Sequence, residues 1–342
     1  MVNVAIIGCG YWGPNLIRNF VVCPSTELLW ACDTNIDRLR HALKPYPAVQ
    51  GATDINEILS NQDIQAVAIA TPVHTHYDIA RACLEADKHV LVEKPLASSV
   101  AQGEELVKLA HEKSLQLMCD HTYCYTGAVR KIKEIVMSGD LGDLLYFDSV
   151  RINLGLFQKD INVVWDLAPH DISILDFLME NKPVSVSAHG VCHSDNNLEN
   201  IAYVSLQYSN QFIAHFHVNW LSPVKLRRTI IGGMEKMLVW NDLVPSERIK
   251  IYDKGIEIRK DDQDAKRGLL VSYRTGDIHA PQFNETEALS LMVKEFAECI
   301  MENRPAFTDG ESGLRVLRIL EAAQRSIKAD GANVRIEYPQ DS

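Results

Sequence analysis

A lysine between an acid and a proline follows a short apolar run, and it is the side chain of this sequence best suited to chemistry. The run is His89-Val90-Leu91-Val92, and the triplet after it is Glu93-Lys94-Pro95. A lysine held at the end of a buried strand can hydrogen-bond a substrate oxygen and stabilise negative charge as it develops there. The alternative is a surface turn, in which Pro95 ends the strand and Lys94 points into water.

Three glycines near the amino terminus predict a phosphate-binding turn. Gly8, Gly10 and Gly13 come after an apolar strand expected at residues 3–7 and before a helix expected at residues 15–22. In a dinucleotide fingerprint the first glycine permits a tight turn, the second lets the backbone approach the pyrophosphate, and the third allows close helix packing. The helix N-terminus then faces the phosphates. The alternative is a turn that merely uses three glycines.

Asp33 ends the next expected strand and predicts which dinucleotide binds. An acid about 20 residues after the glycines can bind both ribose hydroxyls of the adenosine and would repel a 2′-phosphate. This favours NAD over NADP, although Arg38 lies close enough in sequence to keep NADP open. Thr71-Pro72 ends a further strand, where loops at the carboxyl edge of a parallel sheet reach a ligand.

No metal site is predicted. His74 and His76 follow Thr71-Pro72, but two histidines at that spacing do not make one, and either can start the next helix or lie beside the cofactor. The eight cysteines contain no CxxC pair, so they are expected to be reduced core residues, and a zinc-dependent alcohol dehydrogenase is disfavoured.

The elements that must position these residues alternate between strand and helix up to about Asp120, which is typical of a doubly wound parallel sheet. The predicted strands are short and apolar throughout, as in a sheet buried on both faces. They are residues 3–7, 27–32, 66–70, 89–92 and 116–119, and the predicted helices are 15–22, 36–43, 55–59, 77–85 and 98–113. We therefore predict an NAD-binding Rossmann domain over residues 1–120.

Longer strands with period-two alternation follow, and they predict a large, open, mainly antiparallel sheet. Residues 201–208 and 211–218 form an expected hairpin, and a charged stretch, Lys260–Lys266, is expected to be a solvated loop. The other predicted strands are 144–153, 184–191, 224–231, 237–240 and 249–252, and the predicted helices are 128–138, 286–302 and 311–328. We predict that residues 121–342 form a second, α/β domain.

The bulk composition fits a globular protein of two domains. The chain has 342 residues, of which 46% are hydrophobic and 23% charged. Its formal net charge of -11 disfavours a nucleic-acid partner, with Lys225, Arg227 and Arg228 as a small basic exception. No run approaches the roughly 20 apolar residues that span a bilayer. We therefore expect a cytoplasmic protein without a membrane partner.

Four stretches together resemble the Gfo/Idh/MocA oxidoreductases. They are Gly8–Gly13, Thr71–His76, Lys88–Pro95 and Trp165–His170, and the late stretch Thr308–Val316 is similar to the closing helix of that family. Their order and spacing cover nearly the whole chain. The resemblance implies a Rossmann domain followed, over residues 121–342, by an α/β domain for substrate binding and oligomerisation. The open sheet of that domain often serves as a subunit interface, and hence we expect a homodimer or homotetramer.

The resemblance also implies roles for single residues. Lys94 corresponds to the active-site lysine of the family, Asp166 to its active-site acid and His170 to its catalytic histidine, and Pro95 to a proline commonly preceded by a cis peptide. The residues predicted to bind the cofactor are Gly8, Gly10, Tyr11, Trp12, Gly13, Asp33, Arg38, Thr71, Pro72, His76, Glu93 and Lys94. The residues predicted to bind the substrate are Lys94, His121, Tyr123, Trp165, Asp166 and His170.

Two of the implied roles have alternatives in the sequence itself. Asp166 could be a plain helix N-cap, with Leu167-Ala168-Pro169 as the first turn. If the segment is helical throughout, Asp166 and His170 share one face. Trp165 could line the nicotinamide or fill the core, and His215 with His217, which share a strand face, could contact substrate, an interface or solvent.

The chemistry implied is hydride transfer between a nicotinamide and a secondary alcohol. His170 would take the hydroxyl proton, and Lys94, kept cationic by Glu93 or Asp166, would hydrogen-bond the same oxygen. The chain looks most like members that act at C3 of nucleotide-linked sugars. An inositol or free-sugar dehydrogenase is the alternative, and an NAD-using glycosidase is a more distant one. Asp120-His121-Thr122-Tyr123 stands where many relatives carry an Arg-Phe pair, so substrate choice does not carry over from them.

Overall fold

The computed structural model describes residues 1–155, 160–195, 197–253, 255–259, 270–274 and 276–338, with the backbone alone for 255–259 and 270–274. These residues form two compact units. Unit 1 comprises Met1–Thr126, Ile172–Phe177 and Thr286–Glu321, and unit 2 comprises Gly127–Asp171, Leu178–Glu285 and Ala322–Ser342. Residues 121–126 and two later segments thus belong to unit 1 although they lie beyond the predicted boundary at residue 120. The division into domains at that residue stays a prediction.

Unit 1 is built on a parallel sheet of six strands. They are β1 (Val2–Ile7), β2 (Thr26–Cys32), β3 (Gln50–Ala52), β4 (Ala66–Ile69), β5 (His89–Glu93) and β6 (Leu117–Asp120). The strand order is β3-β2-β1-β4-β5-β6, and every pair is parallel. The order reverses direction between β1 and β4, which is where doubly wound sheets bind their ligands. The predicted Rossmann sheet is confirmed.

Helices cover both faces of this sheet. They are α1 (Gly13–Val22), α2 (Ile36–Leu43), α3 (Ile55–Leu59), α4 (His76–Glu85), α5 (Val100–Glu112) and α8 (Ala288–Glu302), with the short helices η1 (Val73–Thr75) and η2 (Thr122–Tyr125) and the first turns of α9 (Gly310–Lys328). Leu16, Ile17 and Phe20 lie one turn apart or adjacent on α1, so they bury one stripe. Phe20 meets Phe296 of α8 edge to face, with ring centroids 6.5 Å apart.

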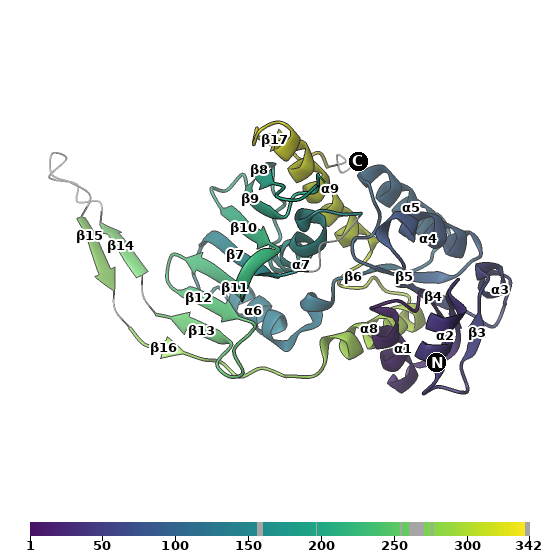
Figure 1. The fold of residues 1–342 in the computed structure, drawn as a ribbon. Helices are drawn as coiled ribbons and strands as arrows, with labels where there is room; N and C mark the ends of the chain where they lie inside the picture. The colour runs from purple at the N-terminus through teal and green to yellow at the C-terminus, as the bar shows by residue number, and fades with distance from the viewer. Residues whose placement is uncertain (156–159, 196, 254, 260–269, 275, 339–342) are drawn as a thin grey trace. The chain divides into compact units, whose positions relative to one another are not determined.

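Unit 2 is built on a mixed sheet of nine strands. They are β7 (Leu144–Leu154), β8 (Ser185–Val191), β9 (Ile201–Gln207), β10 (Ile213–Asn219), β11 (Leu221–Gly233), β12 (Met237–Asn241), β13 (Ile249–Tyr252), β16 (Ile278–His279) and β17 (Val334–Arg335). The order is β16-β13-β12-β11-β7-β10-β9-β8-β17 (Figure 1). Only β7 and β10 pair in parallel, so the predicted open, mainly antiparallel sheet is confirmed for the described residues. A separate two-stranded sheet consists of β14 (Gly255–Arg259) and β15 (Leu270–Arg274).

Alternation along the strands gives this sheet two different faces. Val204 and Phe216 are fully buried, as are their neighbours two positions along β9 and β10. On the other face Tyr203 is 47% exposed and stacks on His215 and His217, with centroids 6.0 and 4.5 Å away. The helices of the unit are α6 (Gly127–Met137), the first turns of α7 (Val163–Leu178) and the last turns of α9.

The structure differs from the sequence prediction at a few elements. The strand β3 was missed because Gln50-Gly51-Ala52 has no apolar run. β11 begins three residues before the predicted start, and Pro223 is tolerated there because the register shifts between Leu221 and Leu226. The stretch Lys260–Lys266, predicted to be a solvated loop, lies outside the described residues. No helix in the part of the chain that the structure describes is long and apolar enough to cross a membrane.

Candidate functional site

The glycine-rich turn has the geometry of a phosphate cradle. Gly8 has a φ of +101°, and a Cβ there would lie 2.6 Å from the carbonyl oxygen of Ala70. A Cβ on Gly13 would lie 2.1 Å from the carbonyl oxygen of Gly8. A Cβ on Gly10 would meet nothing within 4 Å. The first and third glycines are therefore required by the fold, and the second leaves a space that a pyrophosphate can fill at the N-terminus of α1.

Asp33 is held beside this turn by main-chain donors. The amide of Cys9 donates to Oδ2 at 2.8 Å, and the amide of Asn35 donates to Oδ1 at 2.8 Å. Both carboxylate oxygens keep lone pairs for ribose hydroxyls. Burial, and next the nearby Asp33, raise the pKa of the Cys9 thiol to about 12. That thiol is therefore protonated near neutral pH. Arg38 is exposed on α2.

His76 ties the loop after β4 to the loop after β5. It is 1% exposed, and its Nδ1 lies 2.9 Å from the carbonyl oxygen of Pro95 while its Nε2 lies 2.8 Å from that of Thr71. Burial lowers the pKa of this histidine against the opposing effect of the two carbonyls. The main chain already occupies both ring nitrogens, so contact between His76 and a cofactor stays a prediction. Pro72 in the same loop is exposed.

Lys94 stands at the carboxyl end of β5, at the same sheet edge as the glycine turn. The peptide between Lys94 and Pro95 is cis, as the resemblance implied. The charge of Lys94 acts on His76, Asp120 and His121. Burial, reinforced by Lys94 and Arg315, lowers the pKa of His121 to about 3, so this buried ring is neutral.

Asp120 lies at the same edge of the sheet and was not among the predicted site residues. It is 2% exposed and ends β6, where it is the register partner of Glu93 at the end of β5. Trp12 Nε1 donates to its Oδ2 at 3.3 Å, and the hydroxyl of Thr122 donates to its Oδ1. Burial raises the pKa of Asp120, while Thr122, Trp12 and Lys94 oppose that shift. A polar residue directly after an apolar strand was the available signal.

Asp166 and His170 lie one turn apart on α7, so the helical interpretation of this segment is confirmed. The N-cap is Asn162, whose Oδ1 accepts from the amide of Trp165 at 3.1 Å. The alternative of Asp166 as N-cap is therefore wrong, because the helix begins three residues earlier and Pro169 lies inside it. Trp220, which is 2% exposed, donates from Nε1 to Oδ2 of Asp166 at 3.1 Å. The sequence analysis did not predict this contact, because no local sequence pattern indicates it.

A buried ion pair anchors the same stretch of α7 to the sheet. Arg151 of β7 donates from Nε to Asp171 Oδ2 and from its Nη2 to Oδ1, both at 2.8 Å. Each side chain is 4% exposed. Asp171 follows His170 directly, so the pair fixes the helix next to that residue within unit 2.

The predicted residues thus divide between the two units. Unit 1 holds the predicted cofactor residues together with Lys94, His121 and Tyr123, and unit 2 holds Trp165, Asp166 and His170. Within unit 1 the glycine turn, Asp33 and Lys94 share one sheet edge. Tyr11 is 92% exposed in the turn, and Trp165 and Tyr123 are half-buried. Among the described residues, no group of three or more His, Cys, Asp or Glu side chains could hold a metal ion.

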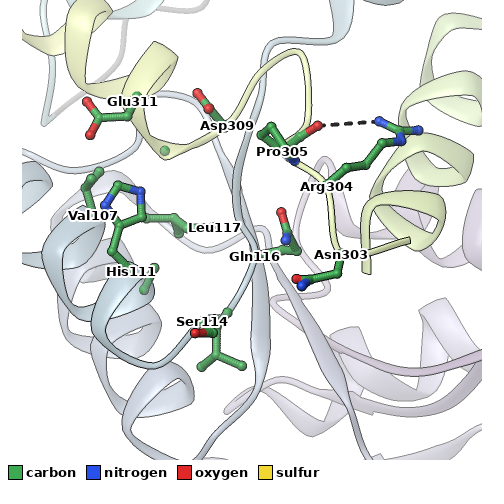
Figure 2. A pocket seen from close by; sticks show the side chains of 13 residues that line it. Val107, His111, Ser114, Gln116, Leu117, Asn303, Arg304, Pro305, Asp309 and Glu311 are labelled. Atoms are coloured by element: carbon green, nitrogen blue, oxygen red, sulfur yellow. Dashed lines mark hydrogen bonds between the residues drawn. The ribbon is translucent and has the colours of Figure 1, made fainter. Parts of the chain in front are cut away.

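A pocket of about 290 Å³ lies elsewhere in unit 1. It is lined by the end of α5, the start of β6 and the connection from α8 to α9 (Figure 2). His111, Gln116, Arg304 and Asp309 contribute polar atoms. None of the predicted site residues is among its lining residues. Because it opens at the start of β6, it is distinct from the edge where β6 ends at Asp120.

Family models match both halves of the chain. Residues 2–121 match the oxidoreductase family with an NAD-binding Rossmann fold, in its GFO_IDH_MocA form. Residues 129–239 match the GFO/IDH/MocA C-terminal domain.

Curated relatives and solved structures cover nearly the full length. The chain is 26% identical to the UDP-N-acetylglucosamine 3-dehydrogenase of Acidithiobacillus ferrooxidans, over 92% of this chain and 94% of that protein. It is 24% identical to the NADP-dependent scyllo-inositol 2-dehydrogenase of Bacillus subtilis, over 85% and 84%. The structure of levoglucosan dehydrogenase with NADH and L-sorbose has the same fold, with a TM-score of 0.83, 20% identity and 99% coverage of both chains. These proteins differ from one another in substrate.

Proposed function

This chain belongs to the Gfo/Idh/MocA oxidoreductases, and we propose that it uses NAD to oxidise or reduce a secondary alcohol carbon of a sugar. The proposed substrate is a nucleotide-linked sugar, reacting at C3. The observation that carries the proposal is the position of Lys94 at the same sheet edge as the glycine turn and Asp33. A dinucleotide bound by that turn would have a lysine next to its path along the edge.

The proposed reaction moves a hydride and a proton, and each of the proposed catalytic residues has a separate role in it. NAD accepts the hydride from the carbon in the oxidation and returns it in the reduction. His170 takes the hydroxyl proton, because a neutral imidazole is a base in the neutral pH range. Lys94 donates a hydrogen bond to the same oxygen as its charge grows. Asp166, positioned by Trp220, lies one turn before His170 and contacts the substrate.

The proposed substrate rests on the relatives and on local charge. One relative with nearly full coverage is a UDP-N-acetylglucosamine 3-dehydrogenase. Lys225 is exposed on β11, and it offers positive charge to an anionic nucleotide in a chain that is acidic overall. A free cyclitol is the second candidate, because another such relative is an inositol dehydrogenase.

The test is a binding and turnover screen. The protein with NAD is melted with UDP-, dTDP- and GDP-sugars and with free cyclitols, since a ligand that binds only the folded state raises the melting temperature. Sugars that shift the melt are then assayed for NADH at 340 nm. We expect a nucleotide sugar to give both signals. Melting shifts with cyclitols alone would remove the nucleotide-sugar proposal, and release of free sugar without NADH would indicate a glycosidase.

We expect the protein to prefer NAD to NADP, and Asp33→Asn to erode that preference. The amide oxygen of asparagine can still accept from Cys9 or Asn35, but the charge that repels a 2′-phosphate is gone. The ratio of kcat/KM for NAD to that for NADP should fall by about tenfold or more. Asp37→Asn, an exposed acid on the first turn of α2, is the control and should leave the ratio unchanged. A wild-type preference for NADP would contradict the assignment.

We expect His170→Asn to slow the reaction by about 10²-fold, the lower end of the contribution of a general base. Histidine accepts a proton only when neutral, so the wild-type rate should fall as the pH is lowered through the range in which histidines titrate. The variant should lose that dependence. Steady-state rates from pH 5 to 9 measure both effects. The control is His189→Asn, which replaces an exposed histidine of β8 in the same unit. An unchanged pH profile in His170→Asn would exclude His170 as the base.

We further propose a homodimer or homotetramer, paired through the exposed face of the nine-stranded sheet, and a cytoplasmic location. Tyr203 and Ile213 are each 47% exposed on that face, which supports an interface. All eight cysteines lie among the described residues and none forms a disulfide. Reduced cysteines are typical of a reducing compartment.

A further inference from the structure

One hydrogen bond joins distant strands of the unit 1 sheet at its carboxyl edge. Trp12 follows β1 and Asp120 ends β6, and the order β1-β4-β5-β6 puts two strands between them. Three strand spacings of about 4.8 Å separate the two backbones by roughly 14 Å. The short Asp120 side chain cannot cover that distance, so the turn and the Trp12 indole must extend over the ends of β4 and β5.

The indole is fixed on one side and accessible on the other. Trp12 is partly buried and packs against the core cluster that contains Met118, Cys124 and Tyr125. Its Nε1 donates to Asp120, whose other carboxylate oxygen accepts from Thr122. The intermediate exposure of Trp12 leaves part of this residue accessible at the carboxyl edge of the sheet, which also carries Lys94.

We infer that Trp12 and Asp120 form the surface against which the nicotinamide ring binds, with Asp120 fixing the indole and placing a negative charge near the ring. This inference rests on the proposed NAD-dependent function. A dinucleotide whose pyrophosphate lies at Gly10 continues along the edge past β4 and β5, over the indole. No role for Asp120 in cofactor binding follows from the glycine fingerprint.

The charges at this edge favour one redox state of the cofactor. The nicotinamide ring is cationic in NAD⁺ and neutral in NADH. An aromatic face attracts a cation, and a carboxylate in a poorly solvated site attracts it further. Within unit 1 Glu93 and Lys94 at the end of β5 carry opposite charges, and Asp33 lies on the other side of the glycine turn, at the end of β2. Arg315, whose charge acts on His121, pairs with Asp176 at 2.8 Å. Asp120 therefore leaves the edge net negative, and the site binds NAD⁺ in preference to NADH.

Binding of NAD⁺, NADH and ADP-ribose to the protein at pH 8, measured by calorimetry, tests the inference without turnover. Asp120→Asn keeps an oxygen to accept from Trp12 but removes the charge. It should weaken NAD⁺ binding by about tenfold and leave NADH and ADP-ribose within about twofold. Trp12→Leu should weaken both nicotinamide forms by about tenfold and leave ADP-ribose unchanged, because that ligand has no nicotinamide.

Asp309→Asn is the matched control. Asp309 is a half-buried acid of the same unit that directly precedes α9 and pairs with Met118 of β6, and asparagine preserves its capping of α9. It should leave all three affinities unchanged. Asp120→Ser is a smaller neutral replacement in case the asparagine variant does not fold, and it should give the same selective loss of NAD⁺.

Two outcomes overturn the inference. Equal losses for all three ligands would mean that Asp120 only supports the fold of the turn. Unchanged NAD⁺ binding in both neutral variants would mean that the charge of Asp120 does not contribute to NAD⁺ affinity. If NAD⁺ binds as described but no sugar is oxidised, the proposed substrate fails and this inference stands. If neither NAD⁺ nor NADP⁺ binds the wild-type protein, both fail.

Discussion

Replacing Lys94 with alanine should lower kcat/KM for the sugar by about 10³-fold while NAD still binds. A donor placed where negative charge develops acts in a site that excludes water, and removal of one such donor typically costs about 10²- to 10³-fold. Lys94 is half-buried at the end of β5 and its charge acts on three neighbouring groups. The measurement is the initial rate of NADH formation, with NAD affinity determined separately by calorimetry.

Two further variants make this result specific. Lys113→Ala removes another lysine of unit 1, one that pairs with Asp87 at 2.6 Å, and should leave the rate unchanged. Lys94→Arg keeps the positive charge in a different shape, so it should recover only part of the lost activity. Turnover of Lys94→Ala within about tenfold of wild type would exclude transition-state stabilisation by Lys94.

Arg151→Met should destabilise the protein by about 3–5 kcal/mol, because it leaves the Asp171 carboxylate buried without its partner. For a unit of this size the melting temperature should fall by roughly 10 °C. The carboxylate receives two hydrogen bonds from Arg151 at 2.8 Å, and water cannot replace them at 4% exposure. Thermal and denaturant unfolding with equal protein concentrations measure the loss.

The double variant Arg151→Met/Asp171→Leu should regain most of the stability, since an apolar pair can replace a buried ion pair at little cost. Arg18→Met is the exposed counterpart. Arg18 pairs with Glu287 at 2.5 Å, but both side chains are 46% exposed, so the cost should stay below about 1 kcal/mol. A double variant as unstable as Arg151→Met would mean that packing around Arg151, and not the buried charge, determines the loss.

The sequence predicted the elements that bury a repeating apolar pattern. Ile36–Leu43 and Ile55–Leu59 were predicted to the residue, and most other bounds were within two or three. The elements that were not predicted are those that form by main-chain pairing without an apolar pattern. β3 is Gln50-Gly51-Ala52, and it exists because its backbone pairs with Trp30, Ala31 and Cys32. Likewise, no local signal predicts that β10 pairs in parallel with β7.

The site divides in the same way. Asp33 and Lys94 could be found because each follows an apolar strand that ends at the ligand edge, and the same rule would have found Asp120. The contact partners of the site residues could not be predicted from the sequence. Trp220 lies 54 positions from Asp166 and Arg151 lies 20 positions from Asp171, and an alternating strand gives no sign of which helix it will contact. Asn162, the N-cap of α7, lies just before the stretch Trp165–His170 from which Asp166 was predicted.

The three glycines of the turn should be under two different kinds of selection. Any side chain at Gly8 or Gly13 collides with the backbone of the protein itself, so natural variants at those positions are lost whether or not a cofactor is present. Gly10 has open space around it, and the folded chain alone would accept an alanine there. Invariance of Gly10 among descendants of this gene would therefore record the continued use of a dinucleotide. In a lineage that no longer binds the cofactor, we expect Gly10 to be substituted before Gly8 or Gly13.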